Sequence, residues 1–232
     1  MMSDARTAIL ARMRASMGRK ADDAERRAAV AERLGASPRG LIPARGRLDP
    51  KERLDLFCRM AEGVQASVAR VSSASDIPHA VADYLKEKNL PARIRFGEDQ
   101  LLAGLPWDRE RHVEVLRGRA VNEDFATLSH ALGGVAETGT LMLTSGPDNP
   151  TTLNFLPEHH IVVLEASDVA GDYESLWDRV RARFGKGVMP RTVNMITGPS
   201  RSADIEQTLL LGAHGPRALH IIVVGSPETG TA

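Results

Sequence analysis

The chain has 232 residues, of which 42% are hydrophobic and 26% charged, as is typical of a soluble globular protein. Its 30 basic residues balance its 30 acidic residues. No apolar run approaches the roughly 20 residues that a membrane-spanning helix needs, and the first residues lack the apolar core of a signal peptide. We therefore expect a cytoplasmic protein made of one large domain, or of one domain and an appendage.

Cysteine usage limits the chemistry that the chain can perform. Its single cysteine, Cys58, cannot hold an iron–sulfur cluster, which typically takes about four thiolates, nor form an internal disulfide or a multi-thiolate zinc site. We expect no intrinsic cofactor, and any redox cluster must lie on a partner. Cys58 falls in the helical pattern LDLFCRMAEGV, which favours a small buried hydrophobe over a reactive thiol.

The N-terminal part of the chain is basic. Residues 1–60 carry 14 Lys and Arg against 8 Asp and Glu, whereas residues 61–232 carry 16 against 22. A basic head can bind nucleic acid, but Phe57 is its only aromatic residue. We therefore prefer a helical arm that docks on a partner or on the body of the protein, and expect no nucleic-acid partner.

The first predicted element is a helix over residues 3–34, where apolar residues recur at helical spacing among good helix formers. A Pro- and Gly-rich stretch follows and ends at Pro50. These patterns divide the chain into a helical extension with a linker, residues 1–49, and a domain over residues 50–232.

The domain alternates short apolar runs with amphipathic helical patterns. Helices are predicted at residues 50–67, in HAVADYLKEKNLP, and at residues 172–184 and 202–212. Strands are predicted at residues 68–73, 92–96, 140–146, 160–166, 193–198 and 219–225. Such alternation is typical of an α/β fold with a mainly parallel sheet flanked by helices.

The junction VNMITGPSRSADIE, residues 193–206, is the most informative candidate site. A buried strand ends there, Gly198-Pro199 forms a tight turn, and Ser200 or Ser202 can cap the next predicted helix. Ligands of open α/β sheets bind at the carboxyl ends of strands, and the free N–H groups of a helix start favour anions. Arg201 adds a fork of donors, so the junction predicts a site for a phosphate or carboxylate.

A structural alternative is equally compatible with this junction. Arg201 would form an ion pair with Asp204 or Glu206 and stabilise a capped helix without binding any ligand. No P-loop motif is present to decide between the two interpretations.

Histidines and a polar loop give weaker signals. His214 and Gly215 lie in a turn before the last strand, where a site is plausible but a surface turn is favoured. His159 and His160 read as loop residues at a strand start, because a metal site needs a third ligand at a known spacing. The loop SGPDNPTTLNF offers polar groups that contact substrate or satisfy the backbone: Asn149, Thr151, Thr152 and Asn154.

Glu137 heads the stretch AETGTLMLTSG, which otherwise reads as a buried strand. Small flexible residues flank it, so the backbone there can approach a ligand closely. We expect Glu137 to be a site residue away from the solvated surface, which hydrogen-bonds a hydroxyl or acts as a general base. The alternative is an ion pair between Glu137 and Arg201 or another arginine that ties two loops together.

Two long segments resemble a known family. The segments GGVAETGTLMLTSGPDNPTTLNFLPEHHIVVLEASDV and MPRTVNMITGPSRSADIEQTLLLGAHGPRALHIIVV are similar, in motif order and spacing, to the lactate-utilisation protein C family (LutC, also YkgG), built on the LUD domain. The resemblance covers about residues 68–226 and is strongest over residues 133–224.

The resemblance implies a fold related to NagB, RpiA and the CoA-transferases, with residues 50–232 as the LUD domain. It also implies an accessory subunit that acts beside iron–sulfur proteins in oxidising L-lactate to pyruvate and binds a small anion at the carboxyl ends of its strands. The rivals are a stand-alone enzyme of CoA-transferase or isomerase type with Glu137 as its catalytic group, and a scaffold without activity. Homo-oligomerisation stays open. The residues that match the family's blocks, and thus its expected site, are Glu137, Thr138, Gly139, Thr140, Gly198, Pro199, Ser200, Arg201, Asp204, Glu206, His214 and Gly215.

Overall fold

The computed structural model describes residues 2–18, 23–203 and 209–227, which form two compact units, Met1–Gly40 and Leu41–Ala232. The first unit contains the helices α1 (Met2–Ser16) and α2 (Ala24–Ala36). The expected single helix over residues 3–34 is therefore wrong. Its break begins at Gly18, whose φ of 62° lies in the left-handed region that a continuing helix does not use.

The second unit is built on a six-stranded parallel sheet with the order β1-β12-β7-β4-β2-β3. Its strands are β1 (Ser67–Val71), β2 (Arg93–Phe96), β3 (Glu114–Arg117), β4 (Ala126–His130), β7 (His159–Glu165) and β12 (Ala218–Val224). The predicted α/β class and mainly parallel sheet are confirmed. Longer helices around it are α3 (Pro50–Gly63), α4 (Ile77–Glu87) and α7 (Tyr173–Phe184), and shorter ones are α5 (Gln100–Ala103) and α6 (Thr152–Phe155).

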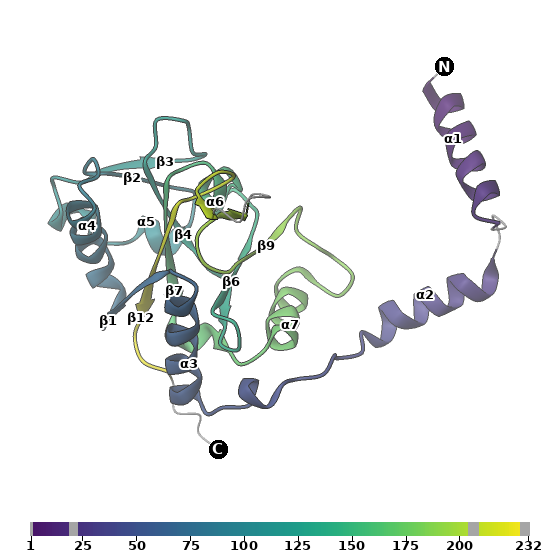
Figure 1. Ribbon diagram of the computed structural model, residues 1–232, viewed down its shortest axis with the longest axis horizontal. Helices are drawn as coiled ribbons and strands as arrows, with labels where there is room; N and C mark the ends of the chain where they lie inside the picture. Colours follow the sequence, from purple (N-terminus) through teal and green to yellow (C-terminus); the bar gives the residue numbers. More distant parts are fainter. Residues whose placement is uncertain (1, 19–22, 204–208, 228–232) are drawn as a thin grey trace. The chain divides into compact units, whose positions relative to one another are not determined.

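Strand alternation distributes the core over both faces of this sheet. In β7, Ile161 and Val163 face a core shared with α4 and α5, whereas Val162 and Leu164 face a core shared with α3. All four side chains are fully buried. Figure 1 shows α4 and α5 on one side of the parallel strands and α3 on the other.

A second, four-stranded sheet has the order β8-β5-β6-β9 and packs on the same face of the main sheet as α3. Its strands are β5 (Gly133–Val135), β6 (Thr140–Thr144), β8 (Val169–Ala170) and β9 (Val193–Ile196). In β6, Leu141 and Leu143 face the main sheet, and Met142 packs towards α7. The predicted strands at residues 140–146 and 193–198 therefore exist, but they pair antiparallel with each other outside the parallel sheet.

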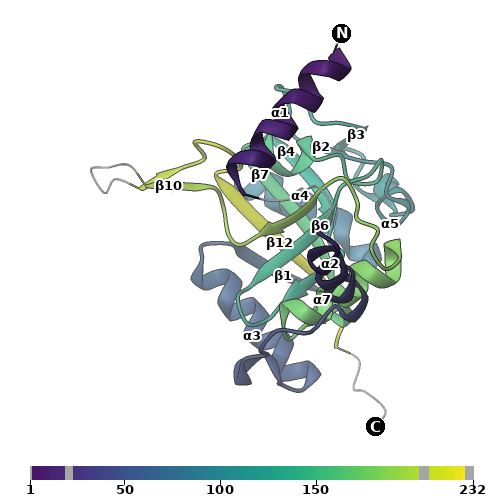
Figure 2. The same cartoon turned by 90° about the vertical axis from the view of Figure 1, so that its right-hand side faces the viewer.

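The predicted helix over residues 202–212 is wrong. Its described ends form an antiparallel hairpin of β10 (Arg201–Ala203) and β11 (Leu209–Leu211), and β10 extends away from the main sheet in Figure 2. Backbone bonds hold the base of the hairpin, because the Gly212 N–H donates to the Ser200 carbonyl at 3.0 Å. The segment gains cross-strand hydrogen bonds there, while Leu210 and Leu211 stay exposed, so no core is available to bury a helix face.

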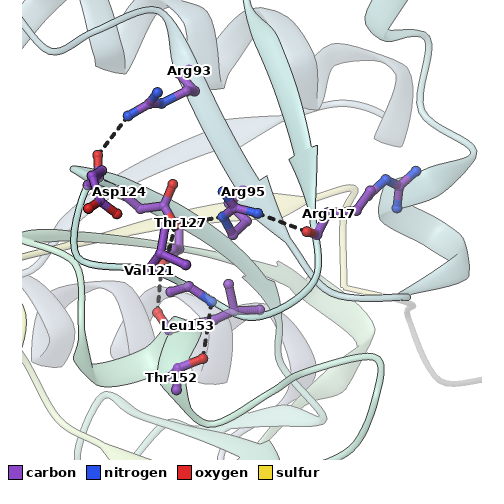
Figure 3. Close-up of polar contacts among 10 residues, drawn as sticks. Arg93, Arg95, Arg117, Val121, Asp124, Thr127, Thr152 and Leu153 are labelled. Carbon is purple, nitrogen blue, oxygen red and sulfur yellow. Dashed lines mark hydrogen bonds and ion pairs between the residues drawn. The ribbon is translucent and has the colours of Figure 1, made fainter.

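An ion pair between the half-buried Arg95 and the buried Asp124 joins β2 to the loop before β4. The Arg95 Nε donates to the Asp124 Oδ2 at 2.6 Å, and its Nη1 donates to the Arg117 carbonyl at 2.9 Å, as Figure 3 shows. The Val121 N–H also donates to Asp124 Oδ2 at 2.8 Å. Each charge is thus hydrogen-bonded as well as paired, which is the condition for tolerating buried charges.

Short 3-10 turns complete the connections: η1 (Ala44–Gly46), η2 (Ala74–Asp76), η3 (Trp107–Arg109) and η4 (Ala166–Asp168). No helix in residues 2–18, 23–203 or 209–227 is both long enough and apolar enough to cross a membrane.

Candidate functional site

A pocket of about 280 Å³ brings together most of the anion site expected from sequence. The expected residues that line it are Gly198, Pro199, Ser200, Arg201, His214 and Gly215. They come from two segments that the β10–β11 hairpin separates along the chain, and folding places them around one opening. The remaining expected residue of this segment, Asp204, lies outside the described residues, as does Glu206.

The pocket lies at the other end of the parallel strands from the one expected. His160 and Leu219, which line it, stand at the amino ends of β7 and β12. Only β9 contributes its carboxyl end, through Ile196 and Thr197, and β9 belongs to the second sheet. The predicted site residues therefore lie near the amino ends of the parallel strands, because the sequence does not reveal that β9 runs in a separate sheet.

Arg201 is held at the pocket by its contact with the end of α3. Its Nη2 donates to the Val64 carbonyl at 2.8 Å, and the guanidinium has further N–H donors. Gly198 makes this approach feasible, because a Cβ there would lie 2.4 Å from the Val64 oxygen, and its φ is 74°. The helix N-terminus that was expected to add anion-binding N–H groups is replaced by β10.

The backbone around Ser200 fixes the other wall of the pocket. The Ser200 N–H donates to the Pro216 carbonyl at 2.8 Å, which joins the Gly198–Arg201 segment to the turn that carries His214 and Gly215. His214 itself is exposed. The turn that sequence reasoning treated as surface is thus also a wall of the pocket.

A chain of buried polar groups forms the floor of the pocket. The Ser129 hydroxyl donates to the Asn154 Oδ1 at 3.2 Å, and the His160 Nε2 lies 3.0 Å from the same hydroxyl oxygen. His160 and Asn154 are each only 1% exposed and both line the pocket. Burial lowers the pKa of His160 to about 3, so the ring is neutral.

Two atoms of these three hydrogen-bonded side chains have no hydrogen-bond partner in the described part of the protein. They are the His160 Nδ1 and the Asn154 Nδ2, and both are buried. The sequence reading had assigned His160 to a loop, whereas His159 and His160 are both part of β7. The sequence indicates that both histidines lie at the start of a strand, but nothing in PEHHIVVLE shows which of them turns inward.

Glu137 lies in the turn between β5 and β6, as its position before the strand suggested. It is 6% exposed, and its N–H donates to the Gly171 carbonyl at 3.3 Å. Among the described residues, its carboxylate has neither a hydrogen bond nor an ion pair. Glu137 does not line the pocket, so the structure does not join it directly to Arg201.

A row of hydroxyl groups connects this turn with the pocket. The Thr138 and Thr140 oxygens are 2.7 Å apart, both lie within 3.0 Å of the Tyr173 hydroxyl, and Thr140 reaches Thr197 at 2.6 Å. Thr197 in turn lines the pocket. Thr138 and Thr140 thus lie beside the site rather than in its wall.

Gly139 packs against protein rather than against open space. A Cβ at this residue would lie 2.4 Å from the backbone nitrogen of Ala61 in α3, and its φ is 67°. The close backbone approach that its sequence context indicated is therefore an approach to α3.

The polar loop divides between structural and pocket residues. Asn149 Nδ2 donates to the Thr144 carbonyl at 3.3 Å, and Thr152 Oγ1 accepts from the Ala120 N–H at 3.1 Å. Thr151 lines a separate pocket with Arg119 and Arg191. Among the four candidates of this loop, the anion pocket contains Asn154.

Sequence reasoning missed a polar cluster at the carboxyl ends of the parallel strands. His130, the last residue of β4, places Nδ1 3.3 Å from the Asp99 Oδ2, and its buried Nε2 has no partner in the described residues. Burial alone would raise the pKa of Asp99, but hydrogen bonds from His130 and from the Leu102 N–H lower it overall. Burial raises the pKa of Glu165, at the end of the neighbouring strand β7.

Neither the Arg201 pocket nor the cluster of His130, Asp99 and Glu165 has the composition of a metal centre. In the described ranges no group of His, Cys, Asp and Glu side chains is arranged to hold a metal ion. Cys58 is half-buried beside the α3 core, and burial raises the pKa of its thiol, as expected for a packing residue.

The comparisons with known proteins define the class. The LUD domain family model matches residues 54–224, so the chain belongs to the LUD domain family, as its motifs indicated. Its fold is similar to the crystal structure of a DUF162 family protein from Deinococcus radiodurans, with a TM-score of 0.58, 24% identity, and coverage of 77% of this chain and 99% of that one.

Among curated relatives, the chain is similar to proteins named lactate utilization protein C. One from Geobacillus thermodenitrificans is 40% identical over 91 residues, which cover 39% of this chain and 38% of the relative. Another from Bacillus subtilis is 34% identical over 119 residues, 50% of this chain and 49% of the relative. The chain thus aligns with less than half the length of each of these relatives.

Proposed function

We propose that this protein serves in a lactate-utilisation system as a cluster-free accessory subunit that binds a small anion in the Arg201 pocket. The lactate role is supported by the names of its relatives and by the LUD family match. The convergence of residues 198–201 and 214–215 on one pocket with a guanidinium carries the binding part of the proposal.

The physical argument for an anion starts from the charges at the pocket. Arg201 contributes a permanent positive charge, and carboxylates are recognised by its planar fork of donors. No Asp or Glu is among the described residues that line the pocket, so none of these side chains opposes an anion. The pocket is also near the lower end of the roughly 300–1,000 Å³ typical of ligand sites, which suits a small acid.

Redox chemistry is assigned to partners in this proposal. One thiol cannot hold a cluster, so electrons from lactate must pass to iron–sulfur subunits that associate with this chain. We expect the purified chain to contain no stoichiometric iron and no visible absorption from a cluster. Iron measured at one or more atoms per chain would contradict this assignment.

A stand-alone activity through Glu137 is the second candidate function. The observation that favours it is a buried glutamate, whose carboxylate has no partner among the described residues, in the turn that also carries Thr138. A carboxylate in such a place can accept a proton from a hydroxyl group. It ranks second because Glu137 does not line the pocket.

Growth of the native host on lactate tests the leading proposal. Deleting the gene should abolish growth on L-lactate and leave growth on pyruvate unchanged, because only the first requires lactate oxidation. A gene with Arg201→Ala should fail to restore growth, whereas Arg111→Ala should restore it, since Arg111 is equally charged, exposed and outside the pocket. Normal growth of the deletion strain on L-lactate would refute the lactate role.

A further inference from the structure

The unpartnered atoms on the pocket floor specify a ligand with a particular arrangement of polar groups. The Ser129 hydroxyl gives its proton to the Asn154 Oδ1, so its oxygen accepts the proton of the His160 Nε2–H. This order fixes the tautomer of the neutral His160, whose Nδ1 carries a lone pair and accepts a hydrogen bond. Asn154 Nδ2 donates one.

Leaving both atoms unpaired is costly. His160 and Asn154 are each 1% exposed, and neither atom has a partner in the described part of the chain. A buried polar group without a hydrogen bond destabilises a protein, so native structures nearly always supply a partner. Both residues line the Arg201 pocket, where a ligand can supply it.

We infer that this pocket selects a small 2-hydroxy acid over the corresponding 2-oxo acid. The ligand's hydroxyl donates to His160 Nδ1, and its carboxylate accepts from Asn154 Nδ2 and from the Arg201 guanidinium. This inference rests on the proposed function and deepens it, because it names the group that the pocket reads. It assigns to His160 a binding role that its sequence context did not suggest, and it selects Asn154 from the four candidates of its loop.

The selectivity follows from donor and acceptor matching. A 2-oxo acid has only acceptors, so its carbonyl oxygen would face the lone pair of His160 Nδ1 and leave that atom unpaired. Since burial lowers the pKa of His160 to about 3, the ring is not protonated at neutral pH and Nδ1 stays an acceptor. Sites that hydrogen-bond a ligand hydroxyl strongly reject analogues that lack it. We expect a preference of about tenfold or more.

Two substitutions of His160 separate the acceptor from the structural bond. His160→Gln keeps a nitrogen near the position of Nε2, so it preserves the contact with Ser129 and removes the acceptor at Nδ1. His160→Asn does the opposite, because its side-chain amide places an oxygen near the position of Nδ1. Both substitutions reduce the buried volume, so each variant serves as a control for the other.

Calorimetric titration of the purified full chain with L-lactate, pyruvate and propionate tests the inference. Wild type and His160→Asn should bind L-lactate about tenfold or more tightly than the other two acids, and His160→Gln should bind all three alike. Asn154→Leu should weaken the binding of both L-lactate and propionate, because both acids lose a donor to the carboxylate. Circular dichroism checks that each variant is folded. If one His160 variant is unfolded, the results for wild type and for Asn154→Leu still test the inference.

Equal wild-type affinity for L-lactate and pyruvate would overturn the inference, as would no binding of any acid or a lactate preference that survives in His160→Gln. These results are distinguishable from failure of the proposed function. Loss of growth on L-lactate in the deletion strain would maintain the lactate role even if the pocket did not discriminate between the acids. Normal growth would refute that role whatever the titrations show.

Discussion

The surroundings of Glu137 make it unlike an ordinary turn residue. It is 6% exposed in the β5–β6 turn, with a carboxylate that has no partner among the described residues. A structural ion pair would require a nearby cation, and Arg201 instead binds the Val64 carbonyl. A carboxylate on a buried residue that forms no structural contact is a candidate for function.

Glu137→Gln distinguishes a functional Glu137 from a structural one. Removing a buried charge should leave the melting temperature equal to or above that of wild type, because no described ion pair is lost. Lactate oxidation by the reconstituted system should fall if the carboxylate accepts a proton. A lower melting temperature with activity retained in the folded fraction would show that Glu137 is structural.

His220 links folding to pH. Burial lowers its pKa to about 4 from an ordinary value of 6.5. Its Nδ1 lies 2.8 Å from Ser67 Oγ, and its ring stacks on Tyr84 with 4.3 Å between centroids. The unfolded chain therefore binds a proton more readily than the folded one, so this contribution to stability is complete above about pH 6.5 and is lost as the pH falls towards about 4.

His220→Gln should flatten the acid dependence of unfolding. Between about pH 7.5 and about pH 5, it should reduce the loss of unfolding free energy by about 2 kcal/mol, measured by urea titration. Overall stability at neutral pH should also fall, because the stack on Tyr84 is lost. An unchanged slope in His220→Gln would contradict the buried neutral state.

Contacts between elements, rather than ligand contacts, explain the glycine of the β5–β6 turn. Gly139 has a φ of 67° and lies against the backbone of Ala61, so α3 packs directly on this turn. Gly187, in the loop between α7 and β9, has a φ of 78° but nothing within 4 Å of the position of a Cβ. The two residues thus share backbone conformation and differ in packing.

Paired alanine substitutions measure the packing between α3 and the β5–β6 turn. Gly187→Ala should cost about 1 kcal/mol of unfolding free energy, because only left-handed backbone strain is added. Gly139→Ala should cost about 3 kcal/mol or more, since the new methyl group must also displace the backbone of α3. Equal costs in urea unfolding would show that α3 yields without strain.

At the scale of the whole molecule, the chain separates into units of different construction. The three hydrophobic cores consist of residues from the unit Leu41–Ala232. The described helices of the other unit, α1 and α2, contribute no residue to them. The described residues of the unit Met1–Gly40 are thus not part of the three cores.

A chain that begins at Leu41 should fold and melt as the full chain does. Its three cores are complete, so the melting temperature should stay within about 2 °C, less than the shift expected for 1 kcal/mol in a domain of this size. Differential scanning calorimetry of both chains measures this. A markedly lower melting temperature would show that residues 1–40 stabilise the domain.

Apolar periodicity alone located the strands at residues 68–73, 92–96, 160–166 and 219–225 and the helix at residues 172–184, because buried strands and amphipathic helices each repeat a pattern within one segment. The family followed from local motifs and is confirmed over residues 54–224. The residues 198–201 and 214–215 were also identified in this way, since Gly, Pro, Arg and His in turns are visible one segment at a time. What the sequence determined by itself was therefore local or carried by contiguous motifs.

Only the tertiary structure decided which segments meet. TLMLT and VNMI read as strands of the parallel sheet, but they pair antiparallel in a second sheet. The pocket that follows VNMI therefore lies at the amino ends of β7 and β12. Residues 202–212 read as a helix, and cross-strand bonds made a hairpin of their described ends. His160 and Asn154 became the pocket floor for the same reason, because burial and hydrogen-bond partners depend on contacts between distant segments that no local pattern encodes.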